Sequence, residues 1–593
     1  MLTKTQFDIL NAIYKANGAS LTQRELAEET GISLGKVNQE KQELLQMHAI
    51  DEFMHLTSRG MEELEPYRVT NAVIMAAGMS SRFAPLSYEK PKALLRVKGE
   101  LLIEREIEQL KAAGIRNIIL VVGYMKERLF YLESKYGVKI AVNEDYYRYN
   151  NTSSLICAVN DLDNTYICSS DNYFVKNPFE TFVYRSYYSA VYAEGKTDEY
   201  CISCNKKGLI TSVMIGGCNS WYMIGHVYFD RSFSKIFAEI LKKEYDNLLT
   251  KQQLWEDLYI RYIDKLDLYI RKYDAAIIKE FDSLEELRQF DNKYLCNADS
   301  SIFANICSVL NVKEQDISEI SPIKNGLTNS SFCFICKGKK YVYRHPGVGT
   351  EKYINRKSEY KSMQTAKRLG LDQTYIYMDA VEGWKISYYI EDVSTLDYHN
   401  EAQVRQALSM LRTLHGSDED TGHFFNIWDE IAEFEKRLKE SGRNQFEDLK
   451  QIHEMIEKLH QYAKTDGVRQ CLCHCDSYDP NFLIDKEGNM SLIDWEYSGM
   501  ADPGCDIGTF IACSDYTDEE AKQVINIYLG YAASDKELRH FLAYVAAAAC
   551  YWFLWAIYQE SLGKNVGEYL YIWYRYTKQY GKEALEMFEK GDV

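Results

Sequence analysis

Several features are scarce in this sequence, and each scarcity narrows the class of protein. There are 8 prolines in 593 residues and no Ser/Gly-rich tract, which argues against long disordered linkers. Basic residues are outnumbered, with 69 Lys and Arg against 87 Asp and Glu, and the net charge of −18 disfavours a general role on nucleic acid or on an anionic membrane. We therefore expect a multidomain globular protein whose charge attracts a cationic small substrate.

The cysteines show no disulfide framework. Their number, 15, is odd, their spacing is irregular, and no signal peptide precedes them, so we predict a cytoplasmic protein. The one C-x-x-C pair, Cys201 and Cys204, has no second pair, which disfavours zinc. Cys471, Cys473 and Cys475 alternate as residues on one face of a strand do. The oligomeric state stays open, a homo-oligomer included.

One long apolar run tests for a membrane span. Residues 541–558 carry no charge over 18 positions, the minimum length for a span. The run holds six Ala, three Tyr and two Trp and no long Leu/Ile/Val stretch. We therefore predict a buried core helix and no membrane span.

Residues 1–67 show the pattern of a small helical domain. Helical apolar spacing precedes Gly18, and LTQRELAEETGISLGKVNQEKQELLQM predicts helix–turn–helix with the turn at Gly31. This region resembles a winged helix-turn-helix domain, which implies DNA binding. It has 4 Lys and 2 Arg against 2 Asp and 9 Glu, a net charge of −5, whereas a DNA reader is usually basic. A packing or dimerisation role stays open.

Residues 68–299 have the pattern of an α/β domain. NAVIMAAG and NIILVVGY are apolar runs that end at glycine, and the helical stretch LLIEREIEQLKAAG lies between them. TYICSSD adds a buried strand that ends at Asp171. The pattern predicts a Rossmann-like domain with a mostly parallel sheet.

A Gly/Ser-rich turn, AAGMSSRFAPLSYEKPKALL, follows the first of these strands. Such a turn offers backbone N–H groups to a phosphate, and Arg82 and Lys92 add positive charge. The stretch resembles the signature of nucleoside-triphosphate transferases. That resemblance implies that Arg82 and Lys92 stabilise the α-phosphate. It also implies that the turn holds the triphosphate through Ala77, Gly78, Met79 and Ser80.

The same resemblance implies two Mg²⁺ ligands. Asp171 ends its strand, and Asp282 in KEFDSLEEL matches the second ligand of the family. An Asp in front of S-L-E-E can also be a helix N-cap, and that alternative stays open for Asp282.

The acceptor is indicated by the stretch YGVKIAVNEDYYRYNNTSSL, which resembles bacterial CTP:phosphocholine cytidylyltransferases. Aromatic faces and a carboxylate hold a quaternary ammonium, and Trp255 with Glu256 is the candidate cage. In a chain with 13% aromatic residues, core packing of Trp255 is the alternative.

Residues 300–593 begin with short strands and continue with long helices, the order of a two-lobed, protein-kinase-like α+β domain. In HCDSYDPNFLID the spacing H-x-D-x-x-x-x-N resembles that of kinase catalytic loops, which implies that Asp476 is the proton acceptor and Asn481 a Mg²⁺ ligand. Two strands around K-E-G-N follow, and a four-residue loop would place Asn481 opposite Asp494, a second ligand.

This part resembles the choline/ethanolamine kinase and aminoglycoside phosphotransferase group. By resemblance, NGLTNSSF is the nucleotide loop, with Gly326, Thr328 and Asn329 near the phosphates. Arg344 stands where a kinase usually has a strand lysine, and Glu359 is its expected partner. We expect His474 to orient the loop.

Aromatic residues near these groups indicate the substrate. Trp495 and Tyr497 flank Glu496, and Trp552 and Trp555 lie three residues apart on one helical face. A box of aromatic rings with one carboxylate suits trimethylammonium, whereas helix core is the alternative for Trp552 and Trp555.

The two resemblances imply consecutive reactions. We expect a bifunctional, Mg²⁺-dependent enzyme that phosphorylates choline with ATP and joins phosphocholine to CTP, giving CDP-choline and pyrophosphate. The alternatives are the same chemistry on ethanolamine or an aminophosphonate, or a transcription regulator that senses choline metabolites.

Overall fold

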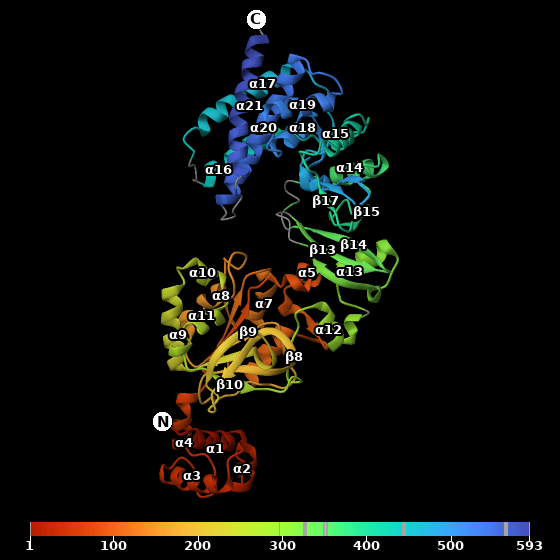
Figure 1. The fold of residues 1–593 in the computed structure, drawn as a ribbon. Helices are drawn as coiled ribbons and strands as arrows, with labels where there is room; N and C mark the ends of the chain where they lie inside the picture. The colour runs from red at the N-terminus through yellow and green to blue at the C-terminus, as the bar shows by residue number, and fades with distance from the viewer. Residues whose placement is uncertain are drawn as a thin grey trace. The chain divides into compact units, whose positions relative to one another are not determined.

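The structure is a computed structural model that describes residues 2–295, 297–323, 329–347, 350, 354–441, 446–561, 567 and 569–591. The chain divides into two compact units, Met1–Gln315 and Asp316–Val593 (Figure 1). Helix α13 (Ser301–Leu310), which the sequence prediction assigns to the third domain, falls in the first unit.

The first unit begins with a helical domain whose helices are capped by hydroxyl side chains. Thr3, Thr22, Ser33 and Thr57 each accept a hydrogen bond from a backbone N–H of the following helix. The four helices are α1 Lys4–Lys15, α2 Gln23–Thr30, α3 Leu34–Gln46 and α4 Ser58–Leu64. A bridge between Ile50 and Leu56 forms a small wing, which confirms the predicted winged helix-turn-helix.

Helix α1 attaches this domain to the rest of the unit. Phe182 lies in the hydrophobic core of the helical domain, and its ring meets Tyr14 edge-on at 4.9 Å between centroids. Tyr184 contacts Phe7 at 5.3 Å, and Lys15 pairs with Glu180. The helical domain therefore shares a core with the α/β domain.

A seven-stranded mixed sheet forms the α/β domain, in the order β10-β8-β9-β6-β1-β4-β5. Four neighbouring pairs are parallel: β10–β8, β6–β1, β1–β4 and β4–β5. The strands are β1 Asn71–Ala76, β4 Ile118–Val122, β5 Lys139–Val142, β6 Thr165–Ser169, β8 Tyr187–Cys204, β9 Ile210–Phe229 and β10 Tyr269–Lys272. The mostly parallel sheet is thus confirmed.

Helices and short strands surround this sheet. The helices are α5 Leu86–Glu89, α6 Leu102–Ala112, α7 Tyr131–Tyr136, α8 Thr152–Ile156, α9 Arg231–Glu244, α10 Leu248–Gln252, α11 Trp255–Arg261 and α12 Leu284–Phe290. Two small sheets pair β2 Arg96–Val97 with β3 Glu100–Leu101, and β7 Asn172–Phe174 with β11 Ile278–Glu280. The sequence prediction did not include the long β8–β9 hairpin, because its outer half is exposed and lacks an apolar run.

The second unit has a small lobe built on a five-stranded antiparallel sheet in the order β12-β13-β14-β16-β15. Its strands are β12 Ile317–Pro322, β13 Asn329–Cys336, β14 Lys339–Pro346, β15 Tyr375–Met378 and β16 Lys385–Tyr388. Helix α14 (Arg356–Arg368) belongs to this lobe, so the predicted lobe of strands is confirmed.

The large lobe of the second unit is mostly helical. Its helices are α15 Glu401–His415, α16 Ile427–Ser441, α17 Leu449–Thr465, α18 Gly504–Ala512, α19 Asp518–Leu529, α20 Asp535–Ser561 and α21 Tyr569–Gly591. Its short strands are β17 Ser394–Thr395, β18 Cys471–Cys473, β19 Phe482–Ile484, β20 Met490–Leu492 and β21 Gly499–Ala501.

Helix α20 contains the long uncharged run. Within the described residues it is the one helix long and apolar enough to cross a membrane, and 78% of its apolar window is buried inside the protein. It packs in the core of the large lobe with α16, α18 and α21. This packing agrees with the predicted core helix.

The β19–β20 hairpin differs from the sequence prediction by one residue. Ile484 pairs with Met490, so the loop has five residues, and Gly488 adopts the left-handed conformation with φ of 83°. The backbone N–H of Ile493 donates to the carbonyl of Asn481, so Ile493, and not Asp494, lies opposite Asn481. Asp494 itself is left-handed, with φ of 66°, and leaves the strand at that point.

Candidate functional sites

The Gly78 turn joins β1 to the cavity of the α/β domain. A Cβ atom on Gly78 would meet no atom within 4 Å, so the backbone there is open to a ligand, and Ser80 is left-handed with φ of 48°. The cavity has a volume of about 340 Å³, and Ala77, Gly78, Met79 and Ser80 all line it. The structure therefore brings the predicted phosphate loop to a cavity.

Lys92 and Asp171 meet in the same cavity. The Lys92 ammonium is 6% exposed and donates to Asp171 Oδ2 at 2.9 Å, and Ser169 Oγ donates to Oδ1 at 2.6 Å. Burial raises the pKa of Asp171, but Lys92 and the hydrogen bonds outweigh burial and hold the pKa below its ordinary value. Asp171 is thus an anion at neutral pH.

Glu280 is a carboxylate of this site that the sequence prediction missed. It ends β11 opposite Asn172 of β7, which places it beside Asp171. Burial and then the charge of Asp171 raise the pKa of Glu280 to about 8. Two carboxylates that repel one another this way suit a divalent cation. The E-x-D spacing of Glu280 and Asp282 is the signal that could have identified it.

Arg82 and Asp282 lie in the more exposed part of the site. Their side chains are 77% and 40% exposed, and Arg82 Nη2 lies 3.3 Å from Asp282 Oδ1. Ser283, and not Asp282, caps α12 through a hydrogen bond from the N–H of Glu286. The N-cap alternative for Asp282 is therefore excluded, and its predicted metal role stays a prediction.

Trp255 does not line the cavity. It is 1% exposed and stacks on Tyr188 in the core, with 5.8 Å between ring centroids, so the structure places it in the packing role and not in an open cage. Its backbone N–H donates to Asn151 Oδ1, and Glu256 accepts from Asn151 Nδ2 at 3.3 Å and from Tyr188 at 3.0 Å. Burial raises the pKa of Glu256 to about 7.

Asn151 is in turn part of the cavity wall, together with Tyr146 and Tyr149. Trp255 and Glu256 therefore position Asn151 in the cavity wall without lining the cavity themselves. The two tyrosines are the aromatic faces that the cavity does offer, and they lie in the YYRYNN stretch quoted above.

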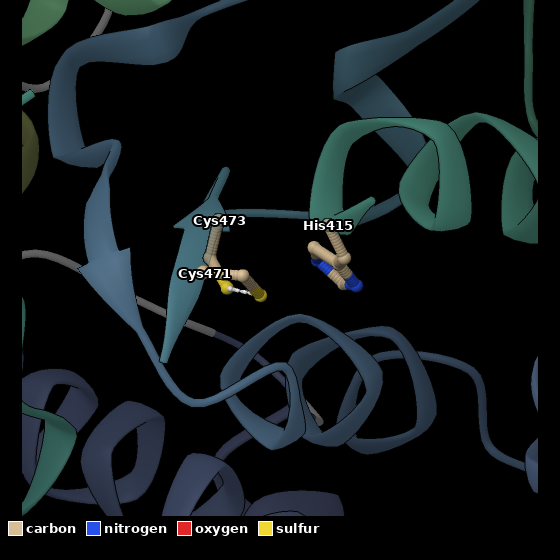
Figure 2. A group of neighbouring side chains, drawn as sticks. All are labelled: His415, Cys471 and Cys473. Carbon is tan, nitrogen blue, oxygen red and sulfur yellow. Dashed lines mark hydrogen bonds between the residues drawn. The ribbon is translucent and has the colours of Figure 1, made fainter. Parts of the chain in front are cut away.

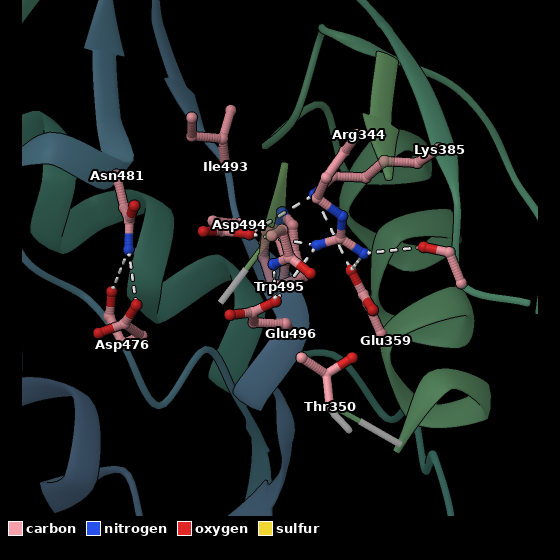
Figure 3. A network of polar contacts seen from close by, with 12 residues as sticks. Arg344, Thr350, Glu359, Lys385, Asp476, Asn481, Ile493, Asp494, Trp495 and Glu496 are labelled. Carbon is pink, nitrogen blue, oxygen red and sulfur yellow. Dashed lines mark hydrogen bonds and ion pairs between the residues drawn. The ribbon is translucent and has the colours of Figure 1, made fainter. Parts of the chain in front are cut away.

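In the second unit, Asp476 and Asn481 form the pair that the spacing predicts. Asn481 Nδ2 donates to Asp476 Oδ2 at 3.0 Å and to its carbonyl at 2.8 Å (Figure 3). Asp476 is 7% exposed, and burial followed by the charge of Asp494 raises its pKa. The aspartate is therefore held in one orientation, with its affinity for a proton increased.

Asp506 organises this loop and was not predicted. Its carboxylate accepts from the backbone N–H of His474 at 2.9 Å and of Cys475 at 2.7 Å. His474 is fully buried, and its Nε2 lies 2.9 Å from the carbonyl of Ile493, next to the ring of Trp495. This geometry suits the orienting role expected of His474. No local motif marks Asp506, which lies 32 residues after His474.

A dense ion-pair network connects the two lobes of this unit (Figure 3). Arg344 of β14 pairs with Glu359 of α14, and its Nη1 lies 3.4 Å from both Asp494 and Glu496. Lys385, which the sequence prediction missed, lies 3.6 Å from Asp494. Burial alone would raise the pKa of Asp494. The charges of Lys385 and Arg344 outweigh burial, so the pKa of Asp494 lies below its ordinary value.

Only part of the predicted nucleotide loop can be placed. Gly326 and Thr328 lie outside the described residues. Asn329 is buried and donates from Nδ2 to Glu496 at 2.7 Å. The amide thus contacts the carboxylate network.

The aromatic residues divide into two groups. Glu496, Tyr497 and Trp555 line a cavity of about 330 Å³. Trp495 is fully buried and donates from its indole to the carbonyl of Leu492, so the structure places it in the core and not in a cage. Trp552 does not line that cavity either.

An aromatic cluster continues from Trp555 towards Asp476. The ring of Trp552 lies 5.6 Å from Trp555 and 6.0 Å from Tyr478, which follows Asp476 by two residues. The indole N–H of Trp552 is buried and has no hydrogen-bond partner within the described part of the chain. Further aromatic residues in the cavity wall, Phe434, Tyr551 and Tyr558, were not predicted.

His415, Cys471 and Cys473 form a group with metal-ligand chemistry in which the ligand atoms lie within 4.8 Å of one another (Figure 2). Both ring nitrogens of His415 are already in hydrogen bonds, one with Tyr528 and one with Asp506, each at 2.8 Å. The imidazole has no free ligand atom, so the group supports Asp506 instead of a metal. Cys471 and Cys473 do lie on one face of a strand, with their sulfur atoms 3.7 Å apart.

Comparison with known proteins separates the chain into three parts. The winged helix-turn-helix DNA-binding family matches residues 2–39, the MobA-like NTP transferase domain matches residues 72–199, and the phosphotransferase enzyme family matches residues 319–541. The chain thus carries a nucleotidyltransferase and a kinase-like phosphotransferase in one polypeptide.

Similar proteins include cytidylyltransferases and a choline kinase. The choline-phosphate cytidylyltransferase of Streptococcus pneumoniae is 33% identical over 220 residues, 37% of this chain and 96% of that protein. The 2-aminoethylphosphonate cytidylyltransferase of Lancefieldella rimae is 36% identical over 230 residues, 38% of this chain and 94% of that protein. The crystal structure of the choline kinase LicA from Streptococcus pneumoniae matches 49% of this chain and 98% of that one, at 26% identity and a TM-score of 0.39.

These similarities define first a class and then a family. The chain is a transferase with two catalytic domains, one for nucleotidyl transfer and one for phosphoryl transfer. It belongs to the family of bacterial cytidylyltransferases that includes the two enzymes from Streptococcus pneumoniae and Lancefieldella rimae.

Proposed function

We propose that this protein phosphorylates choline with ATP and then transfers CMP from CTP to the phosphocholine, giving CDP-choline and pyrophosphate. The observation that carries the proposal is the presence of both catalytic domains in one chain, because the product of the first reaction is the substrate of the second. The boundaries of the three domains are proposed at 1–67, 68–299 and 300–593, and the location is proposed to be the cytoplasm.

At the phosphotransferase site, Asp476 accepts the proton of the substrate hydroxyl. Asn481 holds the carboxylate in place, and the raised pKa of Asp476 favours proton acceptance at neutral pH. Asn481 and Asp494 would hold Mg²⁺, which suits an amide oxygen and a carboxylate and supplies charge stabilisation on the phosphates. The oxygen of the substrate then attacks the γ-phosphorus of ATP, and ADP leaves.

At the nucleotidyltransferase site, the Gly78 turn binds the triphosphate of CTP through its backbone, and Lys92 neutralises charge near the α-phosphate. Asp171, Glu280 and Asp282 would hold Mg²⁺. The fit rests on the carboxylate set itself, in which the charge of Asp171 raises the pKa of Glu280. A phosphate oxygen of phosphocholine attacks the α-phosphorus, and pyrophosphate leaves.

Choline is the proposed amine because an aromatic cluster extends from Tyr478, two residues after Asp476, to Trp555 in the cavity wall. Tyr478, Trp552 and Trp555 form a continuous cluster, and Glu496 and Glu430 line the cavity with the aromatic residues. Faces of aromatic rings hold a trimethylammonium group well, whereas a primary ammonium also needs hydrogen-bond acceptors around it. Ethanolamine and an aminophosphonate are the alternative acceptors, and the similarity to the Lancefieldella rimae enzyme makes the second a real competitor.

Phosphorus NMR of one reaction tests both steps. Purified protein is mixed with Mg²⁺, ATP, CTP and choline, and we expect the phosphocholine signal first and the CDP-choline signals later. Phosphocholine without CDP-choline would contradict the cytidylyl step. Parallel reactions with ethanolamine and with 2-aminoethylphosphonate rank the acceptors, and a faster turnover of either would overturn the choice of choline.

We propose DNA binding as a second function, because the recognition helix differs from the rest of its domain. On α3 the exposed side chains include Asn38, Gln39 and Gln42, whereas Glu40 is 3% exposed and pairs with Lys36 at 2.7 Å. Of the two glutamates of α3, Glu40 is therefore buried, and the half-buried Glu43 accepts a hydrogen bond from Gln39 at 3.3 Å. Amide side chains pair with adenine in the major groove.

Selection from a random duplex library by the full chain tests this proposal. We expect an A·T-containing site and an affinity that falls with salt. The triple variant Asn38→Ala, Gln39→Ala, Gln42→Ala should lose sequence preference and keep both enzyme activities. No enrichment over input DNA would leave the domain with a packing role.

A further inference from the structure

Two cations of the small lobe lie side by side at the phosphotransferase site. In the β14–β16 register, Arg344 pairs with Lys385. Directly opposed residues of antiparallel strands share one face of the sheet, and both side chains extend towards Asp494 (Figure 3). A strand lysine at the position of Arg344 would normally be the phosphate contact of a kinase.

The two terminal nitrogens of the Arg344 guanidinium are already occupied by protein groups, whereas its buried Nε has no hydrogen-bond partner among the described residues. Its side chain is 5% exposed, it pairs with Glu359, and Nη2 also donates to the carbonyl of Gly383 at 3.2 Å. Nη1 faces Asp494 and Glu496, each at 3.4 Å. Because the donors of a guanidinium are fixed in one plane, Arg344 cannot turn to a phosphate without releasing these partners.

Lys385 is held much less tightly. Its side chain is 12% exposed, and its nearest carboxylates are Asp494 at 3.6 Å and Glu359 at 3.9 Å. Both distances exceed the 2.7–2.9 Å of a charge-assisted hydrogen bond. Within the part of the chain that the structure describes, these two long contacts are the ion pairs of an enclosed ammonium with three donors, which places it for an anionic ligand.

Besides Arg344, Glu359 has Arg356 as a partner, and Arg356 lies closer to it than Lys385 does. Arg356 Nη1 donates to Glu359 Oε2 at 2.8 Å, and Arg356 Nη2 donates to Thr350. Loss of Lys385 would therefore leave Glu359 with two arginines. Asp494 would hold Mg²⁺, and in that case its carboxylate would be less available to Lys385, whose ammonium could contact a phosphate instead.

We propose that Lys385 is the cation that contacts the ATP phosphates, and that Arg344 is a positioning residue that holds Glu359 and Glu496. The proposal rests on the proposed kinase function, because it requires ATP in this site. It assigns the phosphate contact to β16, one strand away from the position that the sequence pattern indicates.

Binding of ATP and adenosine to three variants tests the assignment. Lys385→Met keeps the length of the side chain and removes its charge, Lys385→Arg keeps the charge, and Lys339→Met on the exposed part of β14 is the matched control. We expect Lys385→Met to weaken ATP at least about tenfold, the size of one charge-assisted hydrogen bond, and to leave adenosine within about twofold. Lys385→Arg should recover most of the loss, and Lys339→Met should resemble the wild type.

The outcomes separate this inference from the proposed function. If the wild-type protein does not bind ATP, the kinase proposal fails first. If it binds ATP and Lys385→Met binds equally well, Lys385 is not the phosphate contact. Arg344→Lys should lower the choline kinase kcat and the thermal stability without distinguishing ATP from adenosine in binding. A selective loss of ATP binding in Arg344→Lys would overturn the division of roles. Adenosine binding in each variant reports that the kinase unit is folded, because that unit is separate from the cytidylyltransferase domain.

Discussion

The two catalytic sites handle the same charged group, a nucleoside triphosphate, with different constructions. In the nucleotidyltransferase site one turn after one strand offers its backbone to the triphosphate, and the buried cation Lys92 pairs with Asp171 of a distant segment. The phosphotransferase site gathers Arg344, Lys385, Asp476 and Asp494 from both lobes. A phosphate contact made by consecutive backbone groups depends on the geometry of one turn, whereas a contact made by side chains from distant strands depends on the balance of their charges.

At each site a carboxylate outside the reacting groups positions a site residue, and the pKa values of these two carboxylates are shifted in opposite directions. Glu256 holds Asn151, and burial raises its pKa to about 7. Asp506 holds the Asp476 loop. Burial raises its pKa, but the hydrogen bond and charge of His415 and the backbone N–H of His474 outweigh burial and lower it. The first group tends to be neutral in the folded protein, and the second is an anion.

The largest expected effect comes from removing the proton acceptor of one site, which tests whether the two sites act independently. Asp476→Asn should reduce choline phosphorylation by about 10²–10⁴-fold, the usual worth of a general base. Cytidylyl transfer from supplied phosphocholine should be unchanged, measured by pyrophosphate release. Collapse of both activities would contradict two independent sites.

Removing the cation of the other site is the reciprocal experiment. Lys92→Met should lower cytidylyl transfer by about 10²–10³-fold, because a charge that stabilises the transition state is lost. Choline phosphorylation, followed by ADP release, should stay within twofold of the wild type. Lys98→Met, an exposed lysine of the same domain, is the control.

The supporting carboxylates predict opposite effects of pH on stability. The pKa of Glu256 is higher in the folded protein than in the unfolded chain. As the pH rises from about 4.5 to about 7, the carboxyl therefore ionises more readily in the unfolded chain, and the free energy of unfolding falls. The wild type should therefore lose about 3 kcal/mol relative to Glu256→Gln over that interval, measured by denaturant unfolding. A difference that is constant with pH would show that Glu256 is not buried as described.

For Asp506 the sign is reversed. Its folded pKa is lowered, so its stabilisation is present above the unfolded pKa of about 4 and is lost as the pH falls through the folded value. Asp506→Asn should cost about 3 kcal/mol at pH 7, because it breaks a buried pair, and less at acidic pH. If the cost grew as the pH fell below about 4, the folded pKa of Asp506 would not be lowered.

The smallest expected effect concerns the amine. Trp555→Leu should raise the KM for choline about tenfold, since a desolvated cation–π contact contributes up to about 2 kcal/mol. The kcat at saturating choline and the KM for ATP should change less than twofold. An equal rise of the KM for ethanolamine would show that Trp555 packs the site and does not recognise the trimethylammonium group.

The sequence allowed prediction of site residues where a short local segment holds both the functional side chains and the turn that positions them. The Gly78 turn, Lys92, Asp171, Asp476 and Asn481 lie in short segments whose spacing reports their geometry. The prediction of Asn481 opposite Asp494 was wrong by one residue, because a five-residue loop with left-handed Gly488 replaced the assumed four-residue loop.

Residues that act through the tertiary fold escaped prediction for a different reason. Asp506 and Lys385 meet the site only after strands and helices from distant segments assemble, and nothing local marks them. For Trp255 the composition gave core packing as the alternative, whereas Trp495 was predicted for the aromatic box alone, and both side chains are buried in the core. Glu280 lies between these two cases. Its E-x-D spacing from Asp282 is a local signal, but its interaction with Asp171 depends on the tertiary fold.

Helix α20 has a consequence for how each new chain is made. Its uncharged residues are covered by α18 and α16, which precede it, and by α21, which follows it. During synthesis the helix therefore emerges before its last covering helix exists, and an exposed apolar helix is prone to aggregation or to capture by a membrane. The large lobe of the kinase unit is thus open to this risk until α21 packs on α20, whereas the assembled protein buries most of that surface.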